Sequence, residues 1–278
     1  MPRVSVICGA YNVCGHYLFE KSIKSILAQT FEDFEFIICD DGSTDKTFEN
    51  LLRLRECDGR IRLIKNEENL GLAATLNRCI EISEGEYIAR HDCDDLSSPD
   101  RLEKQVSLLD GRRDISLLGS YAYLFDQTGV WGKAVFPTEI SKKDFLFSSP
   151  HLHGSVIFRK EALIRAGGYR VAKETRRCED YDLFMRMHVF AKSANLDEYL
   201  YYFCEDKNTY KRRKYRYRID EAKVRIKGFK LLGLMPWAFF YAIKPLIVGL
   251  IPTRILNPVR NKILKRKIVY GDDESSSP

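Results

Sequence analysis

Short apolar runs alternate with longer amphipathic stretches over the first hundred residues. The apolar runs are rich in β-branched and aromatic residues and are bounded by turn-forming residues, which is typical of buried strands. They predict strands over 4–8, 34–39, 61–65 and 86–91. Between them, apolar residues recur with helical spacing and predict helices over 19–29, 44–54 and 72–82. A fourth helix is expected through Leu109, with Ser98 as its N-cap and Pro99 at its first position.

This alternation predicts an α/β fold with a doubly wound, mostly parallel sheet and helices on both faces. Beyond residue 110 the pattern loosens into shorter predicted strands and favours an antiparallel or mixed continuation, over 115–118, 121–125 and 155–159. Ligands bind such sheets at the carboxyl ends of the strands. Polar residues follow three of the predicted strands, in the segments 9–12, 40–45 and 92–95. The sequence therefore predicts a site at this edge.

Three carboxylates, those of Asp92, Asp94 and Asp95, lie within four residues after the fourth predicted strand. Such a cluster repels itself unless a cation neutralises it, and hard oxygen ligands suit Mg²⁺ or Mn²⁺, which in turn bind phosphate oxygens. The alternative is an Asp-rich turn that only shapes a loop or caps a helix. The position at a strand's carboxyl end favours the metal site.

Two further acidic segments allow a structural and a functional interpretation. The segment 40–45 (DDGSTD) fits a turn followed by a helix cap, and Asp41 could also accept a hydrogen bond from a nucleotide base. Glu179 and Asp180 precede an apolar run, so they predict the first turn of a helix, where acids interact favourably with the helix dipole. Their functional alternative is a general base. The chain has no GxGxxG and no GxxxxGK[ST] motif, which disfavours a dinucleotide site and a P-loop.

Composition and charge divide the chain into two parts. A length of 278 residues allows one large α/β domain with an appendage, and 16 Phe with 15 Tyr exclude wholesale disorder. Residues 206–278 hold 18 Lys and Arg against 6 Asp and Glu, whereas residues 1–205 carry a net charge of −6. We expect a catalytic domain over 1–205 and a basic, partly apolar helical extension over 206–278, with a disordered end. The 8 cysteines stand singly and are expected to be reduced.

The extension has features of a membrane-surface segment. Residues 231–251 are mostly apolar but contain Pro236, Pro245 and Lys244, which makes a transmembrane span marginal. The flank 254–267 has six basic residues and no acid, so an interfacial or re-entrant anchor on an anionic membrane is favoured. The alternative is a helical pair packed on the catalytic domain. No apolar leader opens the chain, and we expect a cytoplasmic protein, peripheral at the inner face of the plasma membrane.

The basic run 211–218 invites comparison with nucleic-acid-binding proteins. The body of the chain is acidic and carries no nucleic-acid-binding motif, so nucleic acid is disfavoured as a partner. Attraction to a diphosphate, on a donor or on a lipid-linked acceptor, fits this charge better.

Several motifs in one order together resemble the inverting, family-two nucleotide-sugar glycosyltransferases with the GT-A fold. They are VSVICGAYN, SILAQTFEDFEFIICDDGSTDKT, NLGLAATLNRCIEISEGEYIARHDCDD, SPDRLE, HGSVIFRKEAL and GGYR followed by CEDYDLFMR. The resemblance covers about residues 3–205 and is strongest to small bacterial cell-surface polysaccharide transferases. It implies a GT-A fold and a hexosyl- or N-acetylhexosaminyltransferase. No QxxRW motif follows, which favours transfer of a single sugar over polymerisation.

The resemblance also implies residue roles on the donor side. Ala10 and Tyr11 would contact the nucleotide, and Asp41 would bind the uracil edge. Asp94 would approach the ribose and diphosphate while Asp95 ligates Mn²⁺ or Mg²⁺. Asp92 with Asp94 is the alternative metal-binding pair.

On the acceptor side, Asp180 aligns with the catalytic base of these enzymes, and Glu179 would orient the substrate. His153 and Arg159 are expected to face the pocket, with no role assigned.

The expected function is metal-dependent, inverting transfer of one sugar from a UDP-sugar to a lipid-linked or cell-surface glycan acceptor. Two alternatives come from other classes of protein. One is a catalytically inactive, membrane-associated scaffold with the same fold, against which the retained site acids argue. The other is a nucleotidyltransferase that makes sugar nucleotides. It would need a Gly-rich, basic loop after the first strand, which GAYNVCGH does not provide.

Overall fold

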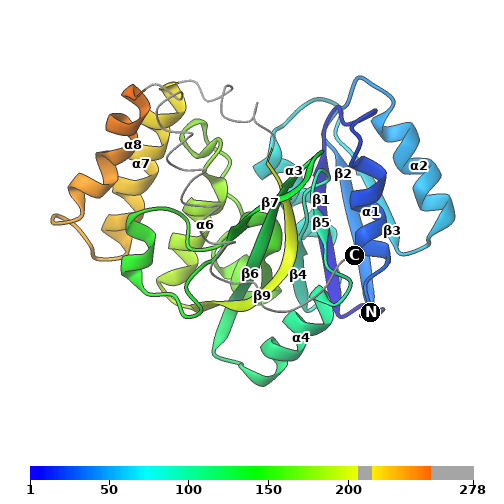
Figure 1. Cartoon of the computed structure of the whole chain (residues 1–278), viewed down its shortest axis with the longest axis horizontal. Helices are drawn as coiled ribbons and strands as arrows, with labels where there is room; N and C mark the ends of the chain where they lie inside the picture. Colours follow the sequence, from blue (N-terminus) through cyan, green and yellow to red (C-terminus); the bar gives the residue numbers. More distant parts are fainter. Residues whose placement is uncertain (206–214, 252–278) are drawn as a thin grey trace.

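The computed structural model describes residues 1–205 and 215–251, in which one mixed sheet lies between two groups of helices (Figure 1). Its strands are β1 (Val4–Ala10), β2 (Phe34–Asp40), β3 (Ile61–Lys65), β4 (Tyr87–Arg90), β5 (Leu96–Ser97), β6 (Ile115–Asp126), β7 (Gly129–Ala134), β8 (Ile157–Arg159) and β9 (Lys192–Cys204). The α-helices are α1 (Phe19–Leu27), α2 (Thr47–Cys57), α3 (Leu72–Ile82), α4 (Arg101–Gly111), α5 (Lys160–Arg165), α6 (Glu179–His188), α7 (Tyr215–Leu231) and α8 (Phe239–Leu250). The short 3-10 helices are η1 (Lys142–Leu146), η2 (His153–Ser155) and η3 (Lys173–Thr175).

The N-terminal half of the sheet confirms the predicted parallel, doubly wound arrangement. The strand order is β3-β2-β1-β4-β8-β6-β9-β5, with β7 paired to β6. β1 pairs in parallel with both β2 and β4, and β2 pairs in parallel with β3. The chain thus builds outward from β1 in both directions, which puts a topological switch point between β1 and β4. This is where a doubly wound sheet opens a crevice for ligands.

The C-terminal half confirms the mixed continuation but differs in detail from its predicted strands. β8 is antiparallel to β4 and to β6, whereas β9 runs parallel to β6. The two short strands predicted over 115–118 and 121–125 are one strand, β6. Gly119 and Ser120 do not break it because they continue to pair with β9 through a register shift.

Two apolar cores result from the alternation of side chains along the central strands. Val4 and Val6 of β1 point into a core shared with α1 and α4, while Ile7 points into the core shared with α3 and α6.

Helix starts are the least accurately predicted boundaries. α4 begins at Arg101 with Asp100 in the N-cap position, so the prediction that Ser98 caps it was wrong. The Ser98 N–H instead donates to the Leu200 carbonyl of β9, and its hydroxyl donates to Asp100. Tertiary pairing with β9 thus holds this segment outside the helix.

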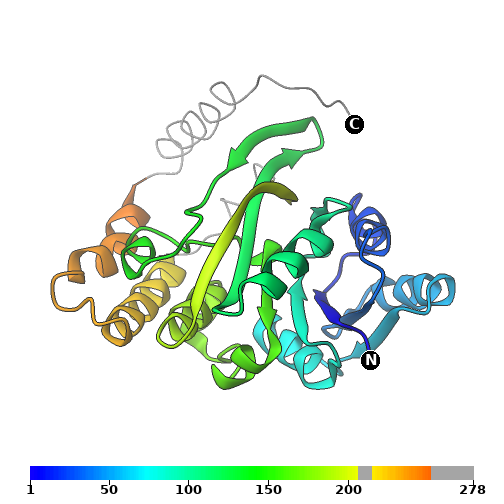
Figure 2. The same cartoon turned by 90° about the horizontal axis from the view of Figure 1, so that it is seen from below.

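The last two described helices form a pair that packs on α6, away from α1 and α2 (Figure 2). Val224, Phe229 and Ala238 are buried in the same core as Met185 of α6. Within the described residues, none of the helices combines the length and hydropathy needed to cross a bilayer. Residues 206–214 and 252–278, which include the first half of the basic run, the basic flank and the acidic end, lie outside the described part of the chain. The domain division at residue 205 stays a prediction.

Gly85, between α3 and β4, offers a test of how closely the first strands pack. A Cβ atom at this position would lie 2.5 Å from the backbone nitrogen of Ser5. We expect Gly85→Ala to lower the free energy of unfolding by about 1–3 kcal/mol in urea denaturation, as overpacked sites do. Gly59→Ala is the matched control, because its Cβ would meet nothing within 4 Å. Equal stabilities of the two variants would contradict the packing described.

Candidate active site

A cavity of about 680 Å³ opens at the carboxyl edge of the parallel strands. Its walls are the end of β1, the segment that leads into α3, and the loop that precedes α6. Four residues predicted from the sequence line it together, namely Ala10, Tyr11, Asp41 and Glu179. These residues come from three distant segments, so the fold alone brings them to one pocket.

Asp41 is the best-anchored carboxylate of this pocket and is only 4% exposed. Its Oδ1 accepts hydrogen bonds from the Asn66 side chain at 2.7 Å and from the Leu70 N–H at 2.9 Å. Its Oδ2 accepts from the Gly71 N–H at 2.9 Å. A carboxylate offers about four acceptor sites, so one is left for a ligand. Asp41 therefore shapes the pocket wall, and its predicted contact with uracil stays a prediction.

The loop after β1 presents Tyr11 to solvent, with 45% of its surface exposed. Asn12 follows with a left-handed backbone (φ 50°) and accepts the Thr44 N–H at 2.9 Å. Asp45 accepts the Cys14 N–H at 3.0 Å. The segment 44–46, predicted as helix, is thus used to fasten the loop, and α2 begins only at Thr47.

The three clustered acids have distinct environments. Asp92 is half-buried and forms an ion pair with the fully buried guanidinium of Arg90. Asp94 is open to solvent on one side, and desolvation by the protein atoms around it, together with the Asp92 charge, raises its pKa to about 6. Asp95 is buried. Its Oδ1 accepts the Cys204 N–H at 2.7 Å, and its Oδ2 has no hydrogen-bond partner among the described residues.

These acids fit a divalent cation that takes most of its ligands from elsewhere. No three His, Cys, Asp or Glu side chains of the described residues converge as a complete metal site. Mg²⁺ and its relatives commonly bind one or two carboxylates, with substrate phosphates and water completing the shell. Asp94 is close enough to Asp92 for the Asp92 charge to add to the desolvation that raises the pKa of Asp94, and a cation between them would offset that charge. The assignment among Asp92, Asp94 and Asp95 stays a prediction.

Asp180 lies in the first turn of α6, as predicted, and its environment differs from that of its neighbours. Desolvation and the adjacent Glu179 charge raise the pKa of Asp180 to about 7, and Asp92 adds to the effect. Asp182, two residues further along α6, forms ion pairs with Arg170 at 2.6 Å and with Arg186 at 2.8 Å. Asp182 is therefore structural, whereas Asp180 forms no ion pair among the residues that the structure describes, and a carboxylate with this pKa suits proton transfer near neutral pH.

The influence of Asp92 on the pKa of Asp180 indicates that the acid cluster and Asp180 lie in one region of the protein. A small polar network lies there as well. Tyr169 is buried, its hydroxyl lies 2.8 Å from Nε2 of His153, and its pKa is raised by burial and by nearby acids that include Asp180. His153 thus contacts Tyr169 and is not among the residues that line the cavity described above.

Sequence reasoning singled out neither Arg90 nor Tyr169, although both stand in the motifs of the family resemblance. The signal for Arg90 was present, because a cation ends an otherwise apolar strand directly before three acids. Burial of a charge requires a partner, and here the partner is Asp92.

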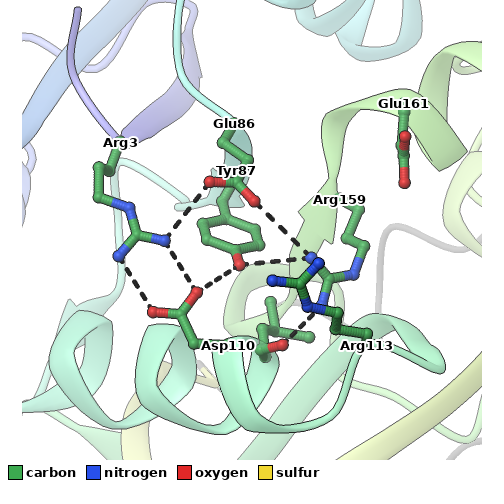
Figure 3. A pocket seen from close by; sticks show the side chains of 8 residues that line it. Arg3, Glu86, Tyr87, Asp110, Arg113, Arg159 and Glu161 are labelled. Atoms are coloured by element: carbon green, nitrogen blue, oxygen red, sulfur yellow. Dashed lines mark hydrogen bonds and ion pairs between the residues drawn. The ribbon is translucent and has the colours of Figure 1, made fainter.

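Arg159 lies in a different place from the one expected. It lines a second cavity, of about 540 Å³, together with Arg3, Glu86 and Asp110 (Figure 3). Because β8 runs antiparallel to β4, Arg159 pairs with Tyr87 at the start of β4, the edge opposite the acids. There it donates to the Ile115 and Leu109 carbonyls, which is a structural role.

Comparison with known proteins places this site in a family. Residues 5–170 match the model of glycosyl transferase family 2. EpsE of Bacillus subtilis, named as a candidate glycosyltransferase, is 40% identical over 267 residues, which cover 94% of each chain. WfgD of Escherichia coli, named a UDP-Glc:α-D-GlcNAc-diphosphoundecaprenol β-1,3-glucosyltransferase, is 32% identical over 143 residues, 51% of this chain and 54% of that one.

Two solved structures show the same fold at low sequence identity. The first is Staphylococcus aureus TarS 1–349 with UDP-GlcNAc, with a TM-score of 0.65 and 19% identity over 82% of this chain and 66% of that one. The second is the Pyrobaculum calidifontis mannosyltransferase PcManGT with GDP-Man and Mn²⁺, with a TM-score of 0.62 and 20% identity over 94% of this chain and 80% of that one. The sheet with its flanking helices is thus a GT-A fold. The chain belongs to glycosyl transferase family 2 and is a glycosyltransferase.

Proposed function

We propose that this glycosyltransferase moves one sugar, with inversion, from a nucleotide-sugar to a lipid-linked or cell-surface glycan acceptor. The observation that carries the proposal is a carboxylate with a pKa of about 7, Asp180, beside a nucleotide-sized pocket and an acid cluster. The solved relatives hold UDP-GlcNAc or GDP-Man. UDP is the favoured carrier for this chain, because an acceptor carboxylate such as Asp41 suits the N–H of uracil.

The reaction would be a single in-line displacement at the anomeric carbon. The acceptor hydroxyl oxygen attacks this carbon while Asp180 takes the hydroxyl proton. A bond from the anomeric carbon to the acceptor forms, the bond to the diphosphate oxygen breaks, and the electron pair leaves with the nucleoside diphosphate. Attack from the face opposite the leaving group inverts the anomeric centre. Desolvation and the Glu179 charge together hold the pKa of Asp180 close to neutral pH.

The leaving diphosphate gains negative charge as the bond breaks. Asp94, with Asp92 or Asp95, would hold Mn²⁺ or Mg²⁺, which supplies positive charge for that group when bound. Arg90 fixes Asp92 from the buried side, so the carboxylates are oriented before any substrate arrives.

The helical extension would bring the enzyme to an anionic membrane surface. Phe240, Ile247 and Leu250 of α8 are 77%, 60% and 73% exposed, and their spacing places them on one face of the helix. In the sequence, the segment 254–267 supplies positive charge beside this face. WfgD is named for an acceptor on diphosphoundecaprenol, and a membrane lipid of that kind would suit this placement. We accordingly assign catalysis to 1–205 and membrane contact to 206–278.

Release of nucleoside diphosphate from UDP-, GDP- and dTDP-sugars, with and without Mn²⁺, is the first test. Metal-dependent release from one donor, in the presence of undecaprenyl-linked acceptors, is the expected result. If donor-binding calorimetry also finds no nucleotide-sugar bound, the inactive membrane scaffold is the correct class. Formation of a sugar nucleotide from a sugar phosphate would instead identify a nucleotidyltransferase.

Asp180→Asn should strongly lower turnover while leaving donor binding within about twofold of the wild type. The substitution removes the proton-accepting carboxylate and keeps the size of the side chain. A fall in kcat of about 10²–10⁴-fold is expected. In the wild type, kcat should rise with pH through about 7, where Asp180 loses its proton. A steady-state profile of kcat against pH measures this dependence. Asp182→Asn, which disturbs the ion pairs of α6 and leaves Asp180 in place, shows how much activity is lost through damage to the helix alone. Unchanged turnover of Asp180→Asn would remove the base assignment.

The same variant should be more stable than the wild type at alkaline pH. The folded-state pKa of Asp180 is raised from 3.8 to about 7, so its ionisation disfavours folding. The penalty is fully present above pH 7, shrinks as pH falls, and vanishes below about pH 4, where both states bind the proton. Urea denaturation at pH 8 and pH 4 measures the gain. A gain of equal size at both pH values would point to a packing effect instead.

Binding to vesicles tests the membrane face. We expect the protein to sediment with phosphatidylglycerol vesicles more than with phosphatidylcholine vesicles. Phe240→Ser with Leu250→Ser should weaken this binding on the order of 10²-fold or more, since each buried side chain of this size contributes about 1.5–3 kcal/mol. Ile164→Ser, on the exposed side of α5, is the control and should bind as the wild type does. Equal binding of all variants would argue against α8 as the contact.

A further inference from the structure

The loop between Arg170 and α6 carries three cations on the wall of the donor pocket. Lys173, Arg176 and Arg177 are exposed, and all three line the cavity that also holds Tyr11 and Asp41. Within residues 1–205 and 215–251, none of the ion pairs involves any of the three. Their charges are therefore available to a ligand of this pocket.

The other side chains of the loop hold it in place from behind. Thr175 is buried, and its hydroxyl bonds with the Arg170 carbonyl at 2.7 Å and the Ala172 carbonyl at 3.0 Å. Glu174 forms ion pairs with Lys227 of α7 at 2.9 Å and with Arg170 at 3.6 Å. The one acid of the loop is thus occupied on the far side, and the cations are left facing the pocket.

Arg177 has an unusual backbone for a long side chain, because its φ is +73°. A left-handed residue other than glycine costs of order 1 kcal/mol and is retained where the surroundings impose it, often at functional sites. Cys178 closes the turn by donating its N–H to the Thr175 carbonyl at 2.9 Å. This turn leads directly into Glu179 and Asp180, and the Arg177 charge is close enough to Glu179 to act against the desolvation that raises the pKa of Glu179.

Without cations, the charge of the site would oppose binding of any phosphate. Asp41 and Glu179 line the pocket, and the Asp92 carboxylate is near enough to raise the pKa of Asp180. A neutral sugar or a nucleoside would meet no such opposition and would need no cation. Three unpaired cations on the wall therefore indicate that the ligand carries concentrated negative charge at this point. Guanidinium groups suit phosphate oxygens in particular.

We propose that Lys173, Arg176 and Arg177 form a cationic wall that binds the diphosphate of the donor and stabilises it as it leaves. The inference rests on the proposed nucleotide-sugar function and goes beyond it by naming three residues that bind the phosphate groups of the donor. The leaving nucleoside diphosphate carries more negative charge than the bound donor does. The wall consequently favours the departing group over the substrate, and its loss should affect kcat as well as KM.

Calorimetry with UDP, UMP and uridine in Mg²⁺ tests the cationic wall directly. The triple variant Lys173→Gln/Arg176→Gln/Arg177→Gln should bind UDP about tenfold more weakly than the wild type or weaker still. Its affinity for UMP should fall less, and its affinity for uridine should stay within about twofold of the wild type. The affinity of the wild type for UDP should fall with added salt more steeply than that of the variant. Arg176→Lys with Arg177→Lys should restore most of the UDP affinity, because it keeps the charge.

Arg113→Gln is the matched control, since Arg113 is an exposed arginine on the second cavity, with Arg159, at the opposite edge of the sheet (Figure 3). It should bind UDP as the wild type does. Wild-type UDP affinity in the folded triple variant would overturn the cationic wall and leave the proposed function intact. Absence of UDP, GDP and dTDP binding by the wild type would overturn both. Equal weakening of UDP and uridine would mean that the loop only shapes the pocket.

Discussion

The buried ion pair between Arg90 and Asp92 is the interaction on which the rest of the site depends. It joins the last residue of β4 to the first acid of the cluster, at the switch point of the sheet. A buried guanidinium without a partner would carry a large desolvation cost, and several converging carboxylates without a cation would repel one another. The ion pair neutralises the guanidinium and also offsets one of the carboxylate charges. Desolvation raises the pKa values of Asp94 and Asp180, and the Asp92 charge adds to both shifts.

Acidic and basic side chains lie on different sides of this region. The acids lie on the side of β4 and α6, whereas Lys173, Arg176 and Arg177 lie on the loop that leads into α6. Glu174 does not cancel these cations, because Lys227 of α7 takes its charge. The helical pair at the C-terminal end of the described chain is therefore part of the electrostatic arrangement, although it contributes no side chain to the pocket.

Local pattern was sufficient for most of the parallel half of the fold. The strand over 61–65 and the helix over 72–82 agree with the structure to the residue, because period and burial coincide there. What failed needed partners distant in sequence. Ser98 pairs with β9 through its backbone instead of capping α4. Arg159 lies at the opposite edge of the sheet because β8 runs antiparallel to β4. Local spacing likewise could not show that Asp182 is held by two arginines while Asp180 stands apart. The cationic loop has no periodicity at all.

The packing of α7 and α8 on α6 has a geometric consequence for the acceptor. The core that contains Val224 and Ala238 also contains Met185, so α8 and the helix that carries Asp180 share one packed core. If α8 lies on a bilayer, as proposed above, the thickness of the packed helices sets the height of Asp180 above the lipid. The acceptor hydroxyl would then have to be presented at that height.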